Sequence, residues 1–185
     1  MGFAIAEALA DAGANVTLVT GPTHLTLQHP HIEIKNVTSA ADMYEACKEV
    51  FPTTDIAVYS AAVADYRPAT QADQKIKKTD NDLTLQLVKT HDIAAELGKQ
   101  KKSGQFIVGF ALETENEEQN ALKKIKAKNF DLIVLNSLND KGAGFAHDTN
   151  KIKLIDKKGE VFEFSLKNKK EVAIDIVNAI VQRYA

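Results

Sequence analysis

The segment QFIVGFALETENEEQNALKKIKAKNFDLIVL, residues 105–135, decides the fold. Its two ends, residues 105–112 and 131–135, are short and apolar on both faces, which is typical of strands buried inside a parallel sheet. Between them, the polar stretch Thr114–Glu117 resembles a helix cap, and we expect a helix from there to about Asn129. A strand, a helix and a second strand in this order predict two parallel strands joined by a helical crossover.

The same alternation of strands and helices continues on both sides of this segment. The other expected strands cover residues 15–20, 32–37, 55–61 and 83–88. The other expected helices cover residues 3–12 and 39–50, a short stretch from about residue 92, and residues 168–183. Residues 152–155 and 161–165 form an expected hairpin. We therefore predict a doubly wound α/β fold, with a mostly parallel sheet, helices on both faces and a C-terminal antiparallel hairpin.

Length and charge limit the possible classes of protein. A chain of 185 residues buries roughly 70% of its surface on folding, which is enough for one domain without disulfides or metals. The 23 basic and 25 acidic residues give a net charge of −2, so we expect no nucleic-acid or membrane-surface partner. The lone Cys47 excludes an internal disulfide framework and a multi-cysteine zinc site, and we expect it to be a small buried filler.

The N-terminal sequence has neither the basic start of a signal peptide nor the length of a membrane span. We therefore expect a cytoplasmic protein. A doubly wound fold ordinarily begins with a strand and a loop, whereas this sequence begins on the helix expected at residues 3–12. Our expectation is a single domain over residues 1–185 that lacks its N-terminal strand and the loop that would cradle a phosphate.

Polar and small residues follow three of the expected strands. Because ligands of open α/β sheets bind at the carboxyl ends of the strands, these segments are candidate site residues. They are Ser60–Arg67, Phe110–Thr114 and Asn136. The alanines of the first segment would let a ligand approach the backbone, and Asp65 offers a fixed acceptor. A structural interpretation is equally open, in which these alanines pack under a loop that Asp65 caps.

Two groups of lysines could recognise phosphate. Lys75, Lys77 and Lys78 place three ammonium groups within four residues of an expected loop. Lys124 and Lys128 are spaced i, i+4 and project from one side of their helix. One interpretation is a basic flap that closes on a polyphosphate, with two further charges from the helix. The alternative is that both groups are solvated surface.

Five motifs occur in the order that one known family shows. They are SAAVADYRP (60–68), KIKK (75–78), LVKTHDIAAEL (87–97), GFALET (109–114) and KKIKAKNFDLIVLN (123–136). Through them, the chain resembles the phosphopantothenoylcysteine synthetases over essentially its whole length. It looks most like the bacterial form, which is often fused behind a flavin-dependent decarboxylase.

The resemblance implies a Rossmann-like ligase domain that performs one step of coenzyme A biosynthesis. The 4′-phosphopantothenate carboxylate attacks the α-phosphate of CTP, which gives an acyl-cytidylate and pyrophosphate. The amine of cysteine then attacks this mixed anhydride and releases CMP. The expected cofactor is Mg²⁺ with CTP, and a flavin is expected only if a decarboxylase domain is fused upstream. The resemblance also implies a homodimer, while the choice of CTP over ATP is not visible in the residue types.

The resemblance also assigns roles to individual residues. It makes Lys75 the flap lysine at the reacting centre. The implied CTP site consists of Ser60, Ala61, Ala62, Asp65, Lys75, His91, Asp92, Ile93, Ala94, Phe110, Lys124 and Lys128. Asn136 is a further candidate. The family's first strand, its Gly-rich segment and an Asn-bearing loop associated with the acyl-cytidylate step would precede Met1.

Two rival functions stay open. An NAD(P)-dependent oxidoreductase would suit the fold, but that class needs an acidic residue after the second strand, where this sequence has Thr20, Gly21 and Pro22. A nucleotide-binding or dimerising fragment without full activity makes the same sequence predictions as the ligase.

Overall fold

A five-stranded mixed sheet forms the body of the computed structural model, which describes residues 1–77, 82–137 and 148–184. The strand order is β3–β6–β7–β8–β9. Its parallel part consists of β3 (Ile56–Tyr59), β6 (Phe106–Glu113) and β7 (Leu132–Ser137). The hairpin of β8 (Thr149–Asp156) and β9 (Val161–Asn168) adds two antiparallel strands. The crossover unit and the C-terminal hairpin predicted from the sequence are therefore confirmed.

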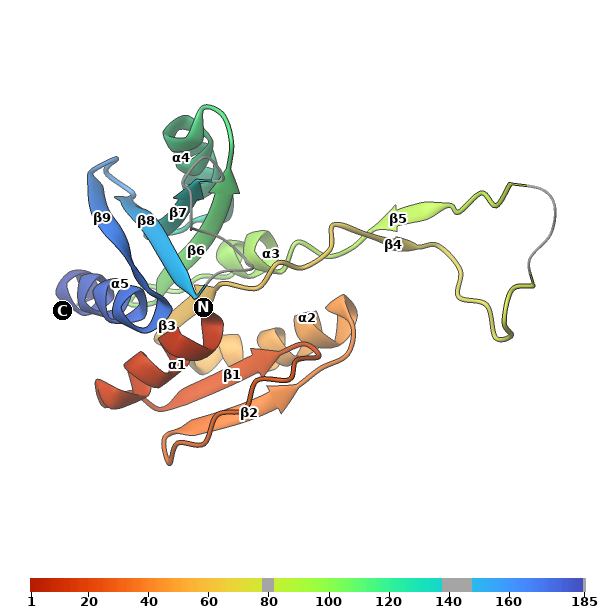
Figure 1. Cartoon of the computed structure of the whole chain (residues 1–185), viewed down its shortest axis with the longest axis horizontal. Helices are drawn as coiled ribbons and strands as arrows, with labels where there is room; N and C mark the ends of the chain where they lie inside the picture. The colour runs from red at the N-terminus through yellow and green to blue at the C-terminus, as the bar shows by residue number, and fades with distance from the viewer. Residues whose placement is uncertain (78–81, 138–147, 185) are drawn as a thin grey trace.

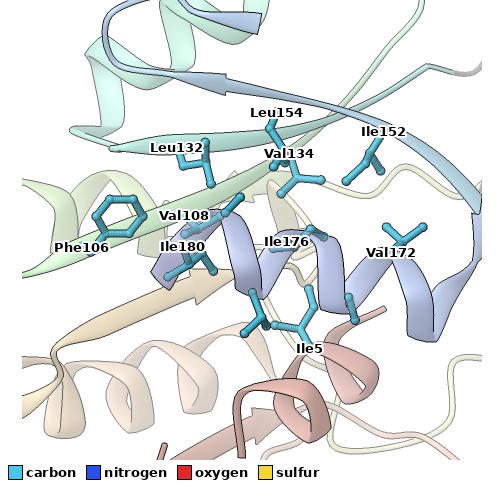
Figure 2. Packing of buried hydrophobic residues seen from close by; sticks show 13 residues of the cluster. Ile5, Phe106, Val108, Leu132, Val134, Ile152, Leu154, Val172, Ile176 and Ile180 are labelled. Carbon is cyan, nitrogen blue, oxygen red and sulfur yellow. The ribbon is translucent and has the colours of Figure 1, made fainter. Parts of the chain in front are cut away.

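Helices cover both faces of this sheet, as predicted. On one face lie α5 (Lys169–Tyr184) and α1 (Gly2–Asp11), and on the other lie α3 (Ile93–Lys99) and α4 (Glu117–Lys128). Figure 2 shows the first core, where residues of β6, β7 and β8 point toward α5. Its fully buried members include Val108, Leu132, Val134, Leu154, Ile176 and Ile180. Alternate residues of the same strands face the second core, because successive side chains of a strand point to opposite faces.

The first two strands do not join this sheet. The parallel pair β1 (Val16–Thr20) and β2 (Ile32–Asn36) forms a separate two-stranded sheet. The helix α2 (Ala40–Val50) follows, and the short 3₁₀ turn η1 (Phe51–Thr53) leads into β3. The mostly parallel sheet expected from the sequence is thus present in two pieces, which Figure 1 shows with β1 and β2 below the body.

Residues 66–77 and 82–89, which we call the arm, extend away from the body (Figure 1). Near its base, β4 (Tyr66–Pro68) pairs antiparallel with β5 (Leu87–Lys89). The strand expected over residues 83–88 is therefore wrong in extent, because only its last two residues belong to β5. In the part of the chain that the structure describes, no helix has both the length and the apolar character of a membrane span.

The predicted helix caps have mixed outcomes. Ser39 and Asp42 form a complete capping box at the start of α2, with hydrogen bonds of 3.1 and 2.9 Å. The cap expected over Thr114–Glu117 is wrong, because α4 begins after Asn116, which has φ of 48° and makes no side-chain cap bond. The left-handed backbone of Asn116 turns the chain sharply out of β6, so Thr114 does not occupy the capping position.

Candidate functional site

A cavity of about 790 Å³ lies at the carboxyl end of β3 and continues between β1 and β3. Most of the candidate residues line it. They are Ser60, Ala61, Asp65, His91, Asp92, Ile93, Ala94, Phe110, Lys124 and Lys128. We call the region around the two lysines and the two aspartates the polar end of the cavity. Residues as far apart in the sequence as Ser60 and Lys128 thus meet at the edge of the sheet where an open α/β fold binds its ligands.

Short backbone contacts hold the loops of the polar end together. The N–H of Thr90 donates to the carbonyl of Asp65 over 2.9 Å, and its hydroxyl donates to the carbonyl of Ala64 over 2.5 Å. The start of α1 lies beside the end of β3, since a Cβ added to Gly2 would be 2.9 Å from Ser60 Oγ. Three separate chain segments therefore enclose this end of the cavity.

Asp92 both caps a helix and pairs with a lysine. Its Oδ1 accepts from the N–H of Ala95 over 3.0 Å, and its Oδ2 lies 2.9 Å from Lys128 Nζ. Burial works against the charged form of Asp92, but the hydrogen bonds from Lys128 and Ala95 outweigh burial and lower the pKa of the carboxyl. Gly98 permits this arrangement of α3 on α4, because a Cβ there would be 2.0 Å from the carbonyl oxygen of Lys128.

Lys124 has a different kind of partner. Its Nζ lies 2.5 Å from Glu113 Oε1, and Asn120 Nδ2 donates to the other carboxylate oxygen over 3.2 Å. The Glu113 side chain is only 14% exposed and does not line the cavity, whereas the Asp92 side chain is 51% exposed and does. Lys124 therefore lines the cavity without its counter-ion, while Lys128 and its counter-ion both line it.

His91 is held by two residues that the sequence analysis did not single out. Its ring stacks on Tyr44, with 4.5 Å between ring centroids and 6° between planes, and its Nδ1 lies 2.8 Å from Glu96 Oε1. Hydrogen bonds from His91 and then from Tyr44 lower the pKa of the Glu96 carboxyl. No signal in the sequence indicates this cluster, because Tyr44 and Glu96 lie on separate helices.

Three candidates lie away from the cavity lining. Lys75, like Lys77, is exposed on the arm, and Lys78 lies outside the described residues. Ala62 is exposed and is not part of the lining. Asn136 is half-buried at the end of β7, where its Oδ1 accepts from Asn150 Nδ2 over 3.0 Å.

The inner part of the cavity contains two groups that the sequence analysis did not place there. Cys47 was expected to be a buried filler, but it is half-buried and lines the cavity. Tyr59 also lines the cavity, and among the described residues its buried hydroxyl has no hydrogen-bond partner. Burial raises the pKa of both groups, and for Tyr59 the neighbouring Cys47 adds to the effect. Both groups are therefore neutral at physiological pH.

The described residues contain no cluster of three or more acidic, histidine or cysteine side chains that could hold a metal ion. The side chains of Asp65 and Asp92 offer two carboxylates at the polar end of the cavity. Such a pair suits a divalent cation that arrives with phosphate ligands better than a cation held by protein groups alone.

Comparison with known proteins gives a consistent result over the whole chain. The family model for the DNA/pantothenate metabolism flavoprotein C-terminal domain matches residues 1–184. A cysteine/cysteine sulfinic acid decarboxylase from an unknown prokaryotic organism is 52% identical over 181 residues, which are 98% of this chain and 50% of that protein. The coenzyme A biosynthesis bifunctional protein CoaBC of Bacillus subtilis (strain 168) is 45% identical over 180 residues, covering 97% of this chain and 44% of that protein.

Among solved structures, the crystal structure of the C-terminal domain of CoaBC is similar, with a TM-score of 0.81 and 38% identity. The match covers 98% of this chain and 81% of that chain. By contrast, the chain spans about half the length of the two curated relatives that it matches.

Proposed function

Since the chain belongs to the family of the DNA/pantothenate metabolism flavoprotein C-terminal domain, we propose that it ligates 4′-phosphopantothenate to cysteine in coenzyme A biosynthesis, with CTP as the activating nucleotide. One observation carries the proposal. Lys124 and Lys128 face a cavity at the carboxyl end of the sheet, beside loops with the small residues that a nucleotide needs for close approach.

In the proposed reaction, a carboxylate oxygen of 4′-phosphopantothenate attacks the α-phosphorus of CTP, and pyrophosphate leaves. The cysteine amine then attacks the acyl carbon, the bond to the CMP oxygen breaks, and the amine loses a proton to solvent. The first step brings a carboxylate to a triphosphate and releases pyrophosphate, and the second releases CMP. Cations in the cavity would lower the activation barrier of both steps by stabilising these negative charges. In this proposal Lys124 supplies one such cation, since it lines the cavity and its counter-ion Glu113 does not.

Lys128 and Asp92 act as a pair in this proposal. A triphosphate would compete with the exposed Asp92 carboxylate for the Lys128 ammonium, and the freed carboxylate could then contact a hydrated cation on the phosphates. Mg²⁺ is therefore proposed to enter with CTP, coordinated mainly by phosphate oxygens and water, with Asp65 or Asp92 as the protein donor.

The catalytic role proposed for Lys75 requires movement of the arm. Lys75 is exposed on the arm and does not line the cavity, so it reaches the reacting groups only when the arm folds over a cavity. That cavity belongs either to the same chain or to the second chain of the proposed homodimer. We further propose a cytoplasmic location, and a flavin only in a decarboxylase domain joined upstream.

A thermal-shift experiment with matched lysine variants tests the nucleotide site. Wild-type protein, Lys124→Gln, Lys128→Gln and Lys126→Gln are each heated with Mg²⁺ and CTP, ATP, UTP or NADPH. We expect saturating CTP to raise the melting temperature of the wild type by about 5 °C, and the other nucleotides to raise it less. Lys126→Gln is the control, because Lys126 is exposed on the same helix and does not line the cavity.

The lysine variants should differ from one another. Loss of a charged hydrogen bond should weaken CTP binding about 10- to 100-fold for Lys124→Gln. Lys128→Gln should have a smaller effect, since Asp92 already compensates that charge within the cavity. Equal CTP shifts in all three variants would contradict the site, and stabilisation by NADPH alone would favour the oxidoreductase instead.

The decarboxylase relative motivates a second candidate function for the whole protein. Its 52% identity is higher than that of the CoaBC relative, although both matches cover only half of the relative or less. Incubation with cysteine alone separates the two activities. A decarboxylase releases CO₂ without any nucleotide, whereas the ligase forms phosphopantothenoylcysteine and CMP only with CTP and 4′-phosphopantothenate. If the chain binds CTP but catalyses neither reaction, it is a nucleotide-binding fragment without full activity.

A further inference from the structure

Two stacked aromatic rings lie at the wall of the cavity. The rings of Tyr44 and His91 are nearly parallel, with 4.5 Å between their centroids. We call these two residues the aromatic pair. His91 lines the cavity and Tyr44 does not. The His91 side chain is 57% exposed, so the stack on Tyr44 leaves more than half of its surface accessible to a ligand.

Contacts from two helices hold the His91 ring in place. Its Nδ1 lies 2.8 Å from Glu96 Oε1 on α3, while Tyr44 belongs to α2. Lys48 Nζ lies 5.6 Å from the centroid of the Tyr44 ring, in a cation–π contact. Hydrogen bonds from His91 and then from Tyr44 lower the pKa of the Glu96 carboxyl, which is therefore a charged acceptor at neutral pH. An exposed ring held in this way has lost rotamer freedom before a ligand binds, so less entropy is lost on binding.

The aromatic pair lies next to a group that can bind phosphate. Asp92 directly follows His91 in the chain, and its Oδ2 lies 2.9 Å from Lys128 Nζ. The backbone on the other side of His91 is fixed as well, because Thr90 is hydrogen-bonded to the carbonyls of two residues after β3. A ligand in which a planar ring is linked to a phosphate chain could therefore contact the His91 ring and the lysines of α4 at the same time.

We propose that the aromatic pair is a platform on which the base of a bound nucleotide stacks, with Tyr44 and Glu96 as positioning residues for the His91 ring. The lysines of α4 would then bind the phosphates, and the platform would bind the base. Stacking on an aromatic side chain tolerates different bases, because every base has a π-face. The platform therefore adds affinity for a nucleotide over bare polyphosphate and contributes little to the choice among CTP, ATP and UTP. This inference rests on the proposed nucleotide site.

The test compares CTP with inorganic tripolyphosphate, which has the phosphate chain without the base. Calorimetric titration in the presence of Mg²⁺ gives the dissociation constant of each ligand. The proteins are the wild type, His91→Leu, His91→Phe and Lys124→Gln. His24→Leu is the control, because His24 is exposed and does not line the cavity.

We expect His91→Leu to weaken CTP binding about 5- to 50-fold and to leave tripolyphosphate binding unchanged. His91→Phe should retain the CTP affinity to within about 3-fold, because it keeps a flat ring and loses only the contact with Glu96. Lys124→Gln should weaken the binding of both ligands about 10- to 100-fold. Tripolyphosphate binding also shows, in each variant, that the polar end of the cavity is intact.

Tyr44 offers a second test, because it supports the ring without lining the cavity. Tyr44→Leu removes the stack and should weaken CTP binding about 2- to 10-fold, whereas Tyr44→Phe keeps the stack and should have no effect. The sequence contains no tryptophan, so His91→Trp would introduce a single fluorophore at the platform. Its fluorescence should be quenched by CTP and not by tripolyphosphate.

The two ligands distinguish failure of this inference from failure of the proposed nucleotide site. Equal weakening of CTP and tripolyphosphate binding in His91→Leu would overturn the inference, since it would indicate a structural role for the ring. Unchanged CTP binding in His91→Leu would also overturn it. If the wild type binds neither ligand, the nucleotide site itself is wrong, and the platform is wrong with it.

Discussion

The central strands β6 and β7 and the strands β1 and β3, which line the inner part of the cavity, have similar sequences and very different surroundings. Val108 and Leu132 have no exposed surface, because each has a strand on both sides and helices above and below. Leu18 and Val58 are equally apolar, but within the described residues each lies on a strand that is paired on one side only, and each is only half-buried. The comparison shows that the burial of an apolar strand, and hence its contribution to stability, is determined by its neighbours.

The largest expected effect comes from one matched pair of leucines. Leu132→Ala removes a fully buried side chain and leaves a cavity in a close-packed core, so it should lower the free energy of unfolding by about 2–5 kcal/mol. Leu18→Ala removes the same atoms from a half-buried position and should cost less than about 1.5 kcal/mol. Urea denaturation of both variants measures the difference. Equal losses would mean that β1 is as well packed as β7.

The central unit was predictable because its information is local. Residues 105–112 and 131–135 are continuous apolar runs, and each became a strand of the parallel sheet within one residue or two of the expected bounds. The spacing of Lys124 and Lys128 correctly indicates that they share one side of α4. These features depend on strand and helix periodicity alone, and they do not require knowledge of which elements pair.

The features that the sequence did not reveal depend on long-range partners. The pairing of Lys124 with Glu113 joins residues 11 positions apart on a strand and a helix, so its geometry follows from the turn at Asn116. Periodicity contains no information about such contacts.

The next largest effect concerns the junction of α3 and α4. Gly98→Ala would place a Cβ 2.0 Å from the backbone carbonyl oxygen of Lys128, and a backbone atom cannot move aside as a side chain can. We expect a loss of about 1–3 kcal/mol in the free energy of unfolding. Gly21→Ala, which meets nothing within 4 Å, is the control and should change stability by less than about 0.5 kcal/mol. A neutral Gly98→Ala would mean that the two helices are not in such close contact.

A finer comparison concerns two helices that each begin with a capping box, α2 beside the cavity and α5 on the central sheet. Ser39 caps α2, which has no buried residue, and Asn168 caps α5, which has six. Replacement of either residue by alanine should lower the melting temperature by a few degrees. The local response should differ, because packing holds α5 in place while α2 depends on its cap. Amide exchange should therefore accelerate through the first turns of α2 in Ser39→Ala and only at the end of α5 in Asn168→Ala. Equal local responses would contradict the difference in packing.

The smallest expected effect concerns the Asp92–Lys128 ion pair, which joins α3 to α4 at the polar end of the cavity. The pKa of folded Asp92 is lowered, so the pair stabilises the fold above the ordinary carboxyl pKa of about 3.9. That contribution is lost as the pH falls through the lower pKa of the folded state. Because the Asp92 side chain is half-exposed, solvent screening keeps the contribution below about 1 kcal/mol. Asp92→Asn and Lys128→Gln should each lose less stability than the wild type on acidification from about pH 5 to pH 2, as measured by urea denaturation at each pH. If Lys128→Gln keeps the full acid dependence of the wild type, the helix cap at Ala95 rather than the lysine is responsible for the low pKa of Asp92.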